Sequence, residues 1–143
     1  MLFSKICIAS DHAGYDLKER IKEYIIKKNV PIIDLGPFSS NSVDYPDFAK
    51  KVSKRLLLKK SDGGILVCGS GTGMAMTANK FKGIRAAQCY NKKSTVLCRR
   101  HNNANIICLG SRMMKNKEAF NFISLFFQTK FDGGRHTKRI NKI

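Results

Sequence analysis

The chain has 143 residues, 43% of them hydrophobic, and a formal net charge of +17 at pH 7. This length and apolar content suffice for one buried core, which excludes a disordered protein. No apolar run reaches the roughly 18 residues of a membrane span, and the first ten residues lack the flanks of a secretory signal, so we expect a cytoplasmic domain that does not associate with a membrane.

Strand-like and helix-like segments alternate along the chain. Short apolar runs predict strands, and apolar residues repeated every three or four positions predict helices. The predicted strands span residues 5–10, 30–36, 63–68, 84–89 and 104–110. The predicted helices span residues 14–28, 45–60, 73–80, 92–102 and 117–129.

This alternation favours an α/β fold. We expect a single Rossmann-like, three-layer domain over residues 1–143, in which helices flank a five-stranded parallel sheet. A basic tail at about residues 132–143 closes the chain.

The positive charge is concentrated in the second half of the chain. Residues 1–62 hold 12 bases and 8 acids, a net charge of +4, whereas residues 63–143 hold 15 bases and 2 acids, a net charge of +13. The longest basic run is only two residues, and no alternation of basic and aromatic residues indicates a stacking platform. Nucleic-acid binding is therefore not the expected main function, although a basic surface can attract a phosphorylated small molecule.

The five cysteines fit a reducing compartment. Their number is odd, and no C-x-x-C pair is present to hold zinc or to perform redox chemistry. Cys7, Cys89 and Cys108 lie within or beside apolar runs, as small buried hydrophobic residues do. Cys68 differs, because a glycine-rich loop follows it directly.

That loop begins where the third predicted strand ends. Gly69, Gly71 and Gly73 alternate with Ser70 and Thr72, so backbone amides can approach an anion closely. The anion could be a phosphate or an oxyanion formed during a reaction, and a tight turn without a ligand is also possible. The lysine of a Walker A loop and the acidic residue of a dinucleotide fingerprint are both missing. The same positive field should make the neighbouring Cys68 a reactive base or nucleophile.

Each of the three histidines has a polar setting. His12 follows Asp11 at the end of the first predicted strand, His101 precedes Asn102 at the end of the fourth predicted helix, and His136 lies in the basic tail. Ligands of parallel sheets bind at the carboxyl ends of the strands, so we expect these histidines to contribute to one site there. Their spacing does not favour a metal site.

Three arginines complete this expectation. Arg112 follows the fifth predicted strand, and Arg135 and Arg139 flank His136. Planar guanidinium groups bind phosphate through paired hydrogen bonds, so these arginines are candidates for a phosphate site.

Several segments together closely resemble the ribose-5-phosphate isomerase B family, which also includes the subunits of galactose-6-phosphate isomerase. The segments are SDHAGYDLKE, DYPDFA, GGILVCGSGTGMAMTANKFKGIRAA, RRHNNANIICLGSR and FDGGRHTKRI. The likeness runs from about residue 5 to the end of the chain.

The resemblance implies an aldose–ketose isomerase that interconverts ribose 5-phosphate and ribulose 5-phosphate in the non-oxidative pentose phosphate pathway. It implies no metal and no nucleotide cofactor. It also implies a homodimer, or a tetramer of dimers, whose active sites take residues from both subunits.

The resemblance also implies a role for each matched residue. Cys68 would be the base that removes a proton at C2 and returns it at C1, with Ser70 assisting, and the amides around Gly69, Gly71 and Gly73 would stabilise the cis-enediolate.

The remaining roles concern the sugar ring and the phosphate. Asp11 and His101 would bind the sugar and open its ring, with His101 supplied by the partner subunit. The residues implied around the phosphate are His12, Arg112, Arg135, His136 and Arg139. The residues implied to orient the sugar are Tyr45, Asn79 and Asn102.

Some positions depart from the family pattern. One branch of the family uses a glutamate as the base, which would fall at Met74; since Met74 cannot abstract a proton, the chain resembles the cysteine branch. Cys98 and Arg100 also replace residues that are more common in the family. Two alternatives stay open: an isomerase of a six-carbon substrate, allose 6-phosphate or galactose 6-phosphate, and a sugar-phosphate-binding protein without catalysis.

Overall fold

The computed structural model describes residues 2–143. The strands are β1 (Ile6–Ser10), β2 (Ile32–Asp34), β3 (Gly63–Cys68), β4 (Ala86–Gln88) and β5 (Ile106–Gly110). The helices are α1 (Tyr15–Ile26), α2 (Tyr45–Leu57), α3 (Thr72–Ala78), α4 (Lys92–Asn102), α5 (Asn116–Gln128) and α6 (Arg135–Ile140). All strand pairs are parallel, in the order β2-β1-β3-β5-β4, so the predicted fold class is confirmed.

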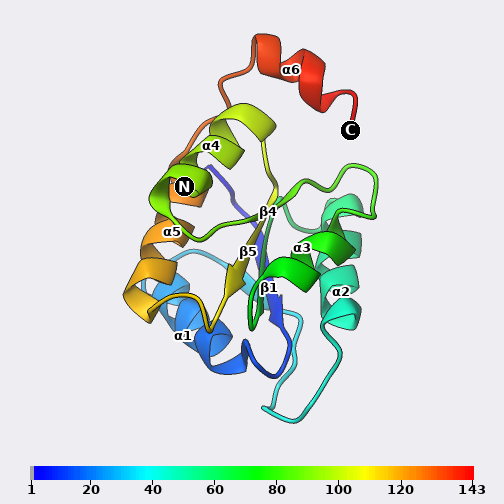
Figure 1. Ribbon diagram of the computed structural model, residues 1–143. Helices are drawn as coiled ribbons and strands as arrows, with labels where there is room; N and C mark the ends of the chain where they lie inside the picture. Colours follow the sequence, from blue (N-terminus) through cyan, green and yellow to red (C-terminus); the bar gives the residue numbers. More distant parts are fainter. Residues whose placement is uncertain (1) are drawn as a thin grey trace.

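The sheet lies between two layers of helices (Figure 1), with α1, α4 and α5 on one face and α2 and α3 on the other. Successive residues of β5 alternate between these layers: Ile107 and Leu109 join the core under α1 and α5, whereas Ile106 and Cys108 join the core under α2 and α3. Every residue of β1, β3 and β5 is buried, which explains their nearly continuous apolar sequences.

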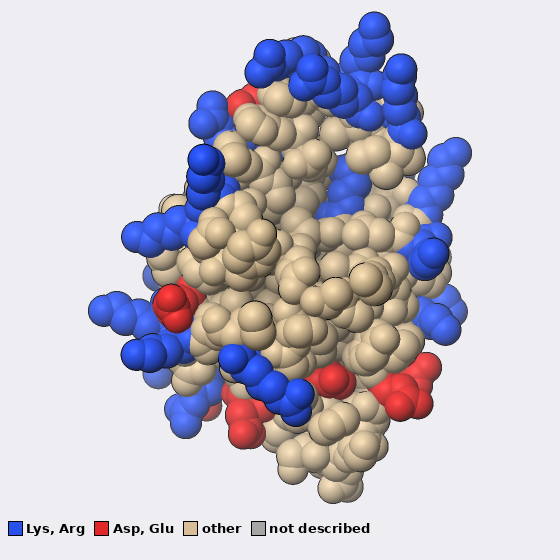
Figure 2. Space-filling view, viewed as in Figure 1, with Lys and Arg blue, Asp and Glu red and all other residues tan. Residues whose placement is uncertain are grey.

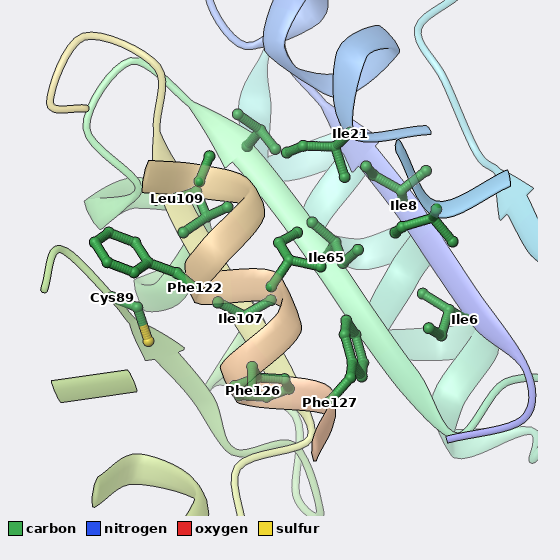
Figure 3. Close-up of a cluster of buried hydrophobic side chains, with 14 of the residues drawn as sticks. Ile6, Ile8, Ile21, Ile65, Cys89, Ile107, Leu109, Phe122, Phe126 and Phe127 are labelled. Atoms are coloured by element: carbon green, nitrogen blue, oxygen red, sulfur yellow. The ribbon is translucent and has the colours of Figure 1, made fainter. Parts of the chain in front are cut away.

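The larger core lies between the sheet and α5. Figure 3 shows strand residues such as Ile65 and Ile107 facing Phe126 and Phe127 of α5. Phe126 and Phe127 pack edge to face, with ring centroids 5.2 Å apart. This packing fixes α5 on the sheet and thereby positions the chain that leads to α6.

Helix α6 was not predicted. Residues 135–140 lie in the expected basic tail, but they form a short helix beside α4, at the end of the molecule opposite the arrow tips of the strands (Figure 1). Its six residues include a single apolar side chain, Ile140, so no hydrophobic repeat marked it.

The strand order creates a ligand-binding position. The chain moves from β1 to β2 on one side of β1 and then returns to β3 on its other side. Ser10 of β1 pairs with Val67 of β3, so the next residues, Asp11 and Cys68, emerge together at the carboxyl edge of the sheet. Crevices of this kind bind ligands in α/β proteins.

Charged side chains are unevenly distributed over the surface. In Figure 2, lysines and arginines gather around α6 and along the sides, whereas the centre of the face shown is largely free of charged groups. Within residues 2–143, no helix has the length and apolarity needed to cross a membrane.

Candidate active site

The glycine-rich loop holds the sulfur of Cys68 in place. The Gly71 amide donates a hydrogen bond to Cys68 Sγ over 3.0 Å, and Cys68 is only 4% exposed. Gly71 has a φ of +83°, a conformation that favours glycine. The loop therefore places a backbone N–H against the sulfur, where it stabilises negative charge on a thiolate.

Close packing explains another glycine in the loop. A methyl group on Gly73 would lie 2.6 Å from the ring of Tyr45, so a larger residue would displace α3 from the start of α2. The loop is fixed further by Gln88, whose Nε2 donates to the Ser70 carbonyl and to Thr72 Oγ1, each over 2.9 Å.

A cavity of about 580 Å³ opens beside Cys68. Its lining brings together the ends of β1, β3 and β5 and the starts of α2 and α3. The lining residues are Asp11, His12, Ala13, Tyr45, Cys68, Gly69, Ser70, Thr72, Gly73, Met76, Arg112 and Met113.

Asp11 and His12 are held by backbone contacts. Asp11 Oδ1 accepts a hydrogen bond from the Gly14 amide over 2.9 Å, and a side chain on Gly14 would collide with the Val67 carbonyl at 2.4 Å. His12 Nδ1 lies 3.1 Å from the carbonyl oxygen of Val43. This contact leaves Nε2 as the ring nitrogen able to reach a substrate.

Arg112 supplies positive charge to the same cavity. Its amide donates to the Gly69 carbonyl over 3.0 Å, and a methyl group on Gly69 would lie 2.9 Å from Arg112 Nη1. The guanidinium therefore packs against the loop that follows Cys68. A buried sulfur, a carboxylate, an imidazole and a guanidinium thus line one cavity, as general base catalysis on an anionic substrate requires.

The other predicted residues form a second cluster. His101 and His136 stack with ring centroids 4.3 Å apart and planes 10° from parallel. Asp132 lies beside them, and both of its carboxylate oxygens accept hydrogen bonds from Arg100 Nε over 3.1 Å. Arg135 and Arg139 flank the same histidine from α6.

Charge shapes this second cluster. The hydrogen bond from Arg100 lowers the pKa of Asp132. Partial desolvation, together with the positive charges of His101, Arg135 and Arg139, lowers the pKa of His136. Asp132 acts in the opposite direction but does not outweigh these groups, so the surplus of positive charge around His136 is suited to an added anion.

The same cluster holds three possible metal ligands, since the donor atoms of His101, Asp132 and His136 lie within 4.8 Å of one another. An ion binds in the plane of an imidazole, and the two planes are nearly parallel. Both rings could therefore not bind one ion without turning, and Asp132 is already paired with Arg100. The arrangement favours an anion over a cation.

The two clusters lie at opposite edges of the sheet. Cys68 pairs with Gly110 at the carboxyl edge, whereas Gly64 pairs with Ile106 at the amino edge. His101 lies in the last turn of α4, just before β5, and stacks on His136 of α6. It therefore lies near the amino end of β5, and Figure 1 shows α6 at that end of the molecule. The expectation that all three histidines share one site at the carboxyl ends of the strands was wrong for His101 and for His136, which stacks on it. A helix that crosses back in a parallel sheet ends where the next strand begins.

Asn79 and Asn102 also lie outside the Cys68 cavity. They line a separate cavity of about 340 Å³ together with Arg85 and Cys98. The Asn79 carboxamide donates to the Ala86 carbonyl and accepts from the Ala86 amide, each over 2.8 Å, and so it anchors the start of β4. In this chain, its polar atoms are already paired.

Sequence reasoning missed two residues beside the predicted ones. Gln88 fixes the loop that follows Cys68, and its position at the end of a strand was a usable signal. Asp132 lies beside His101 and His136, and it is one of only two acidic residues after residue 62. An isolated acid in so basic a segment indicates a specific partner.

The chain is similar to known proteins over nearly its whole length. The sequence profile of the ribose/galactose isomerase family matches residues 6–143. Ribose-5-phosphate isomerase B of Escherichia coli is 38% identical over 139 residues, which cover 97% of this chain and 93% of that protein.

Solved structures are similar over nearly the whole chain. A ribose 5-phosphate isomerase from Thermotoga maritima superposes with a TM-score of 0.96 at 49% identity, covering 97% of this chain and 96% of that one. The ribose-5-phosphate isomerase B of Mycoplasma genitalium, solved with bound ribulose-5-phosphate, superposes with a TM-score of 0.89 at 45% identity, covering 96% and 92%. The chain therefore belongs to the ribose/galactose isomerase family.

Proposed function

We propose that this protein is an aldose–ketose isomerase that interconverts ribose 5-phosphate and ribulose 5-phosphate. The observation that carries the proposal is the Cys68 cavity, where a sulfur held 3.0 Å from a loop amide faces a carboxylate and a guanidinium. The similarity to a relative solved with ribulose-5-phosphate supports the choice of a five-carbon substrate. The reaction belongs to the non-oxidative pentose phosphate pathway.

Proton transfer is the central step. The thiolate of Cys68 removes the proton at C2, which leaves negative charge on the oxygens of a cis-enediolate. Backbone amides around Gly69, Gly71 and Gly73 stabilise that charge as it develops. The protonated sulfur then returns the proton at C1, and Ser70 hydrogen-bonds the reacting hydroxyl groups.

Ring opening requires a second acid–base group, because the substrate is mostly a closed ring. Asp11 lies in the Cys68 cavity, but His101 of the same chain lies at the opposite edge of the sheet. The six residues of β3 separate these edges by roughly 20 Å at about 3.3 Å per residue. That distance exceeds the length of a pentose phosphate, which supports the proposal that His101 comes from the partner subunit.

The residues that bind the phosphate group also come from both subunits. Arg135, His136 and Arg139 lie on α6 near His101, and they enter the site together with it. Arg112 and His12 belong to the subunit that supplies Cys68. The second cluster of one subunit thus binds the phosphate group of the substrate, and the sugar of the same substrate reaches Cys68 of the other subunit.

The surface supports a homodimer. Strand β4 lies at an edge of the sheet, and Met76 on α3 and Tyr90 after β4 are 66% and 62% exposed. The centre of the face in Figure 2 is largely uncharged on a protein with a net charge of +17. Exposed apolar groups on an uncharged surface favour association with a second copy. All five thiols are free, which supports a cytoplasmic location.

A turnover assay tests the proposal. The purified protein is given ribose 5-phosphate, allose 6-phosphate and galactose 6-phosphate, and the ketose products are measured. We expect the five-carbon substrate to have the highest kcat/KM. A preference for a six-carbon sugar would assign a different isomerase, and binding without any product would make the protein a sugar-phosphate binder.

Heavy water tests the chemistry separately. Proton transfer through Cys68 exchanges hydrogen with solvent, so deuterium should enter the product at C1 or C2, as observed by NMR. Product without deuterium at either carbon would contradict the enediolate mechanism.

A further inference from the structure

Two sulfur atoms lie close together outside the active site. Cys89, directly after β4, and Cys98, on α4, have their Sγ atoms 3.8 Å apart. Cys89 is 1% exposed and packs in the core shown in Figure 3, whereas Cys98 is partly exposed. Within residues 2–143, this is the one pair of thiols within hydrogen-bonding distance.

The two sulfurs affect each other. The hydrogen bond from Cys98 lowers the pKa of Cys89 and raises the pKa of Cys98 itself. Burial instead raises the pKa of Cys7 to about 11 and places that of Cys108 well above its ordinary value. The pair thus contains a thiol whose pKa its neighbour lowers, unlike Cys7 and Cys108.

A route from solvent leads to the pair. Cys98 lines the cavity of about 340 Å³ that also contains Arg85 and Asn102, so a small oxidant can reach its sulfur. Cys98 Sγ also lies 3.2 Å from the Thr95 carbonyl, one turn away on the same helix, and this contact directs the side chain toward Cys89.

We propose that Cys89 and Cys98 form a reversible disulfide when the protein meets hydrogen peroxide. Peroxide oxidises one thiol to a sulfenic acid, with two electrons passing from sulfur into the O–O bond and one water leaving. The second thiol attacks the sulfenic sulfur, the S–O bond breaks, the S–S bond forms and a second water leaves. Two thiols and one peroxide thus become one disulfide and two waters.

The link acts on the second cluster of the active site. A disulfide brings the sulfurs from 3.8 Å to about 2.05 Å, and we expect α4 to shift toward the segment after β4 as the bond forms. His101 and Asn102 follow Cys98 by three and four positions and share its face of α4. The disulfide should therefore lower isomerase activity. This consequence rests on the proposed function, but the formation of the disulfide itself is independent of it.

Mass spectrometry tests the bond directly. The full-length protein is treated with hydrogen peroxide, its free thiols are alkylated, and it is digested with trypsin without reduction. We expect peptides 86–92 and 94–99 to appear joined, to separate with dithiothreitol and to stay unlinked in Cys98→Ser. Oxidation of Cys68 shows that the peroxide dose was sufficient. If Cys89 and Cys98 are still alkylated at that dose, or if either pairs with another cysteine, the proposal is overturned.

Activity measurements separate the pair from the catalytic cysteine. Before oxidation, Cys98→Ser should have the same isomerase activity as the wild type. Peroxide should also oxidise Cys68, and both proteins should lose the same activity for that reason. The wild type should lose more than Cys98→Ser and recover the difference with dithiothreitol. Equal losses of activity in the wild type and in Cys98→Ser would show that the disulfide does not affect the active site. If the protein has no isomerase activity at all, the proposed function fails, but the linked peptide should still form.

Discussion

At the scale of single residues, burial alone does not determine what a cysteine does in this fold. Cys7 and Cys68 both face the layer of α2 and α3 and are both buried. Burial raises the pKa of Cys7 to about 11, and its sulfur donates a long hydrogen bond of 3.7 Å to the Gly63 carbonyl. Cys68 instead accepts a hydrogen bond from Gly71 and borders a cavity. Of these two sulfurs, only that of Cys68 both accepts a backbone N–H and borders a cavity that a substrate can enter.

Replacement of the sulfur tests this difference. We expect Cys68→Ala to lower kcat by at least about 100-fold, the usual minimum for a lost general base, while calorimetry shows that the sugar phosphate still binds. Cys7→Ala is the matched control, because it removes a buried thiol from the same layer without reaching the cavity. Near-normal turnover in Cys68→Ala would make another group the base.

Arg139 tests the assignment of the phosphate. Loss of a charge-assisted hydrogen bond costs about 1.5–3 kcal/mol, or roughly ten-fold or more in affinity, so Arg139→Ala should raise KM by at least about that factor and change kcat less. Lys138→Ala removes the same charge from the adjacent exposed position of α6 and should leave KM nearly unchanged. Equal effects of the two variants would indicate general electrostatic attraction without a specific contact.

At the scale of elements, a buried ion pair joins α1 to β2. The Lys18 side chain is 0% exposed, and its Nζ donates to Asp34 Oδ2 over 2.7 Å. Lys22 donates to the same oxygen over 2.8 Å. Burial by itself would raise the pKa of Asp34, but the hydrogen bonds from Lys18 and Lys22 outweigh it and lower that pKa below its ordinary 3.8.

Removal of this carboxylate should destabilise the fold. Asp34→Asn leaves the buried ammonium of Lys18 with one carboxylate partner, the more exposed Glu19. The loss of one partner of a buried ion pair costs about 3–5 kcal/mol. Urea unfolding at neutral pH measures the change in the free energy of unfolding. Glu19→Gln removes an equal charge from the same network at a site that is 32% exposed, so its cost should be below about 1 kcal/mol.

The sign of the pH dependence follows from the lowered pKa. The stabilisation from Asp34 is fully present above its unfolded pKa and is lost as the pH falls through the lower folded pKa. The difference in unfolding free energy between wild type and Asp34→Asn should therefore be constant near neutral pH and shrink in strong acid. A difference that grew with acidification would contradict the pairing.

Most helices and strands could be predicted from the sequence. Every predicted strand and helix is present, because β3 has a continuous apolar run and α2 repeats Phe48, Val52 and Leu56 on its buried face. Helix α6 was missed, since it has no apolar repeat and none of its six residues is buried. Strands β2 and β4 are only three residues long, which local patterns cannot delimit.

The site was predictable only in part for a similar reason. Asp11 and Cys68 could be brought together from the sequence, because the carboxyl ends of neighbouring parallel strands share an edge. The pairing of Asp132 with Arg100 joins residues 32 positions apart, and no local spacing encodes it. The position of His101 at the opposite edge depends on strand order, which a single sequence does not specify.

At the scale of the whole molecule, the proposed mechanism divides the active site between two separate clusters of each subunit. In this proposal the cavity beside Cys68 supplies the base and the amides for the enediolate, and the stacked His101 and His136 belong to the basic cluster beside α6. Neither cluster can turn over substrate alone if the sites are shared across a two-fold interface. The organisation of the dimer is therefore the central claim about function.

Complementation between two inactive variants tests this claim most directly. Cys68→Ala and His101→Ala are co-expressed in equal amounts with different affinity tags, and dimers carrying both tags are counted. Random pairing gives mixed dimers in which one site is intact and the other lacks both groups, so the mixture should recover about a quarter of wild-type activity. Mixed dimers as inactive as the separate variants, or a protein that is active as a monomer, would contradict the shared site.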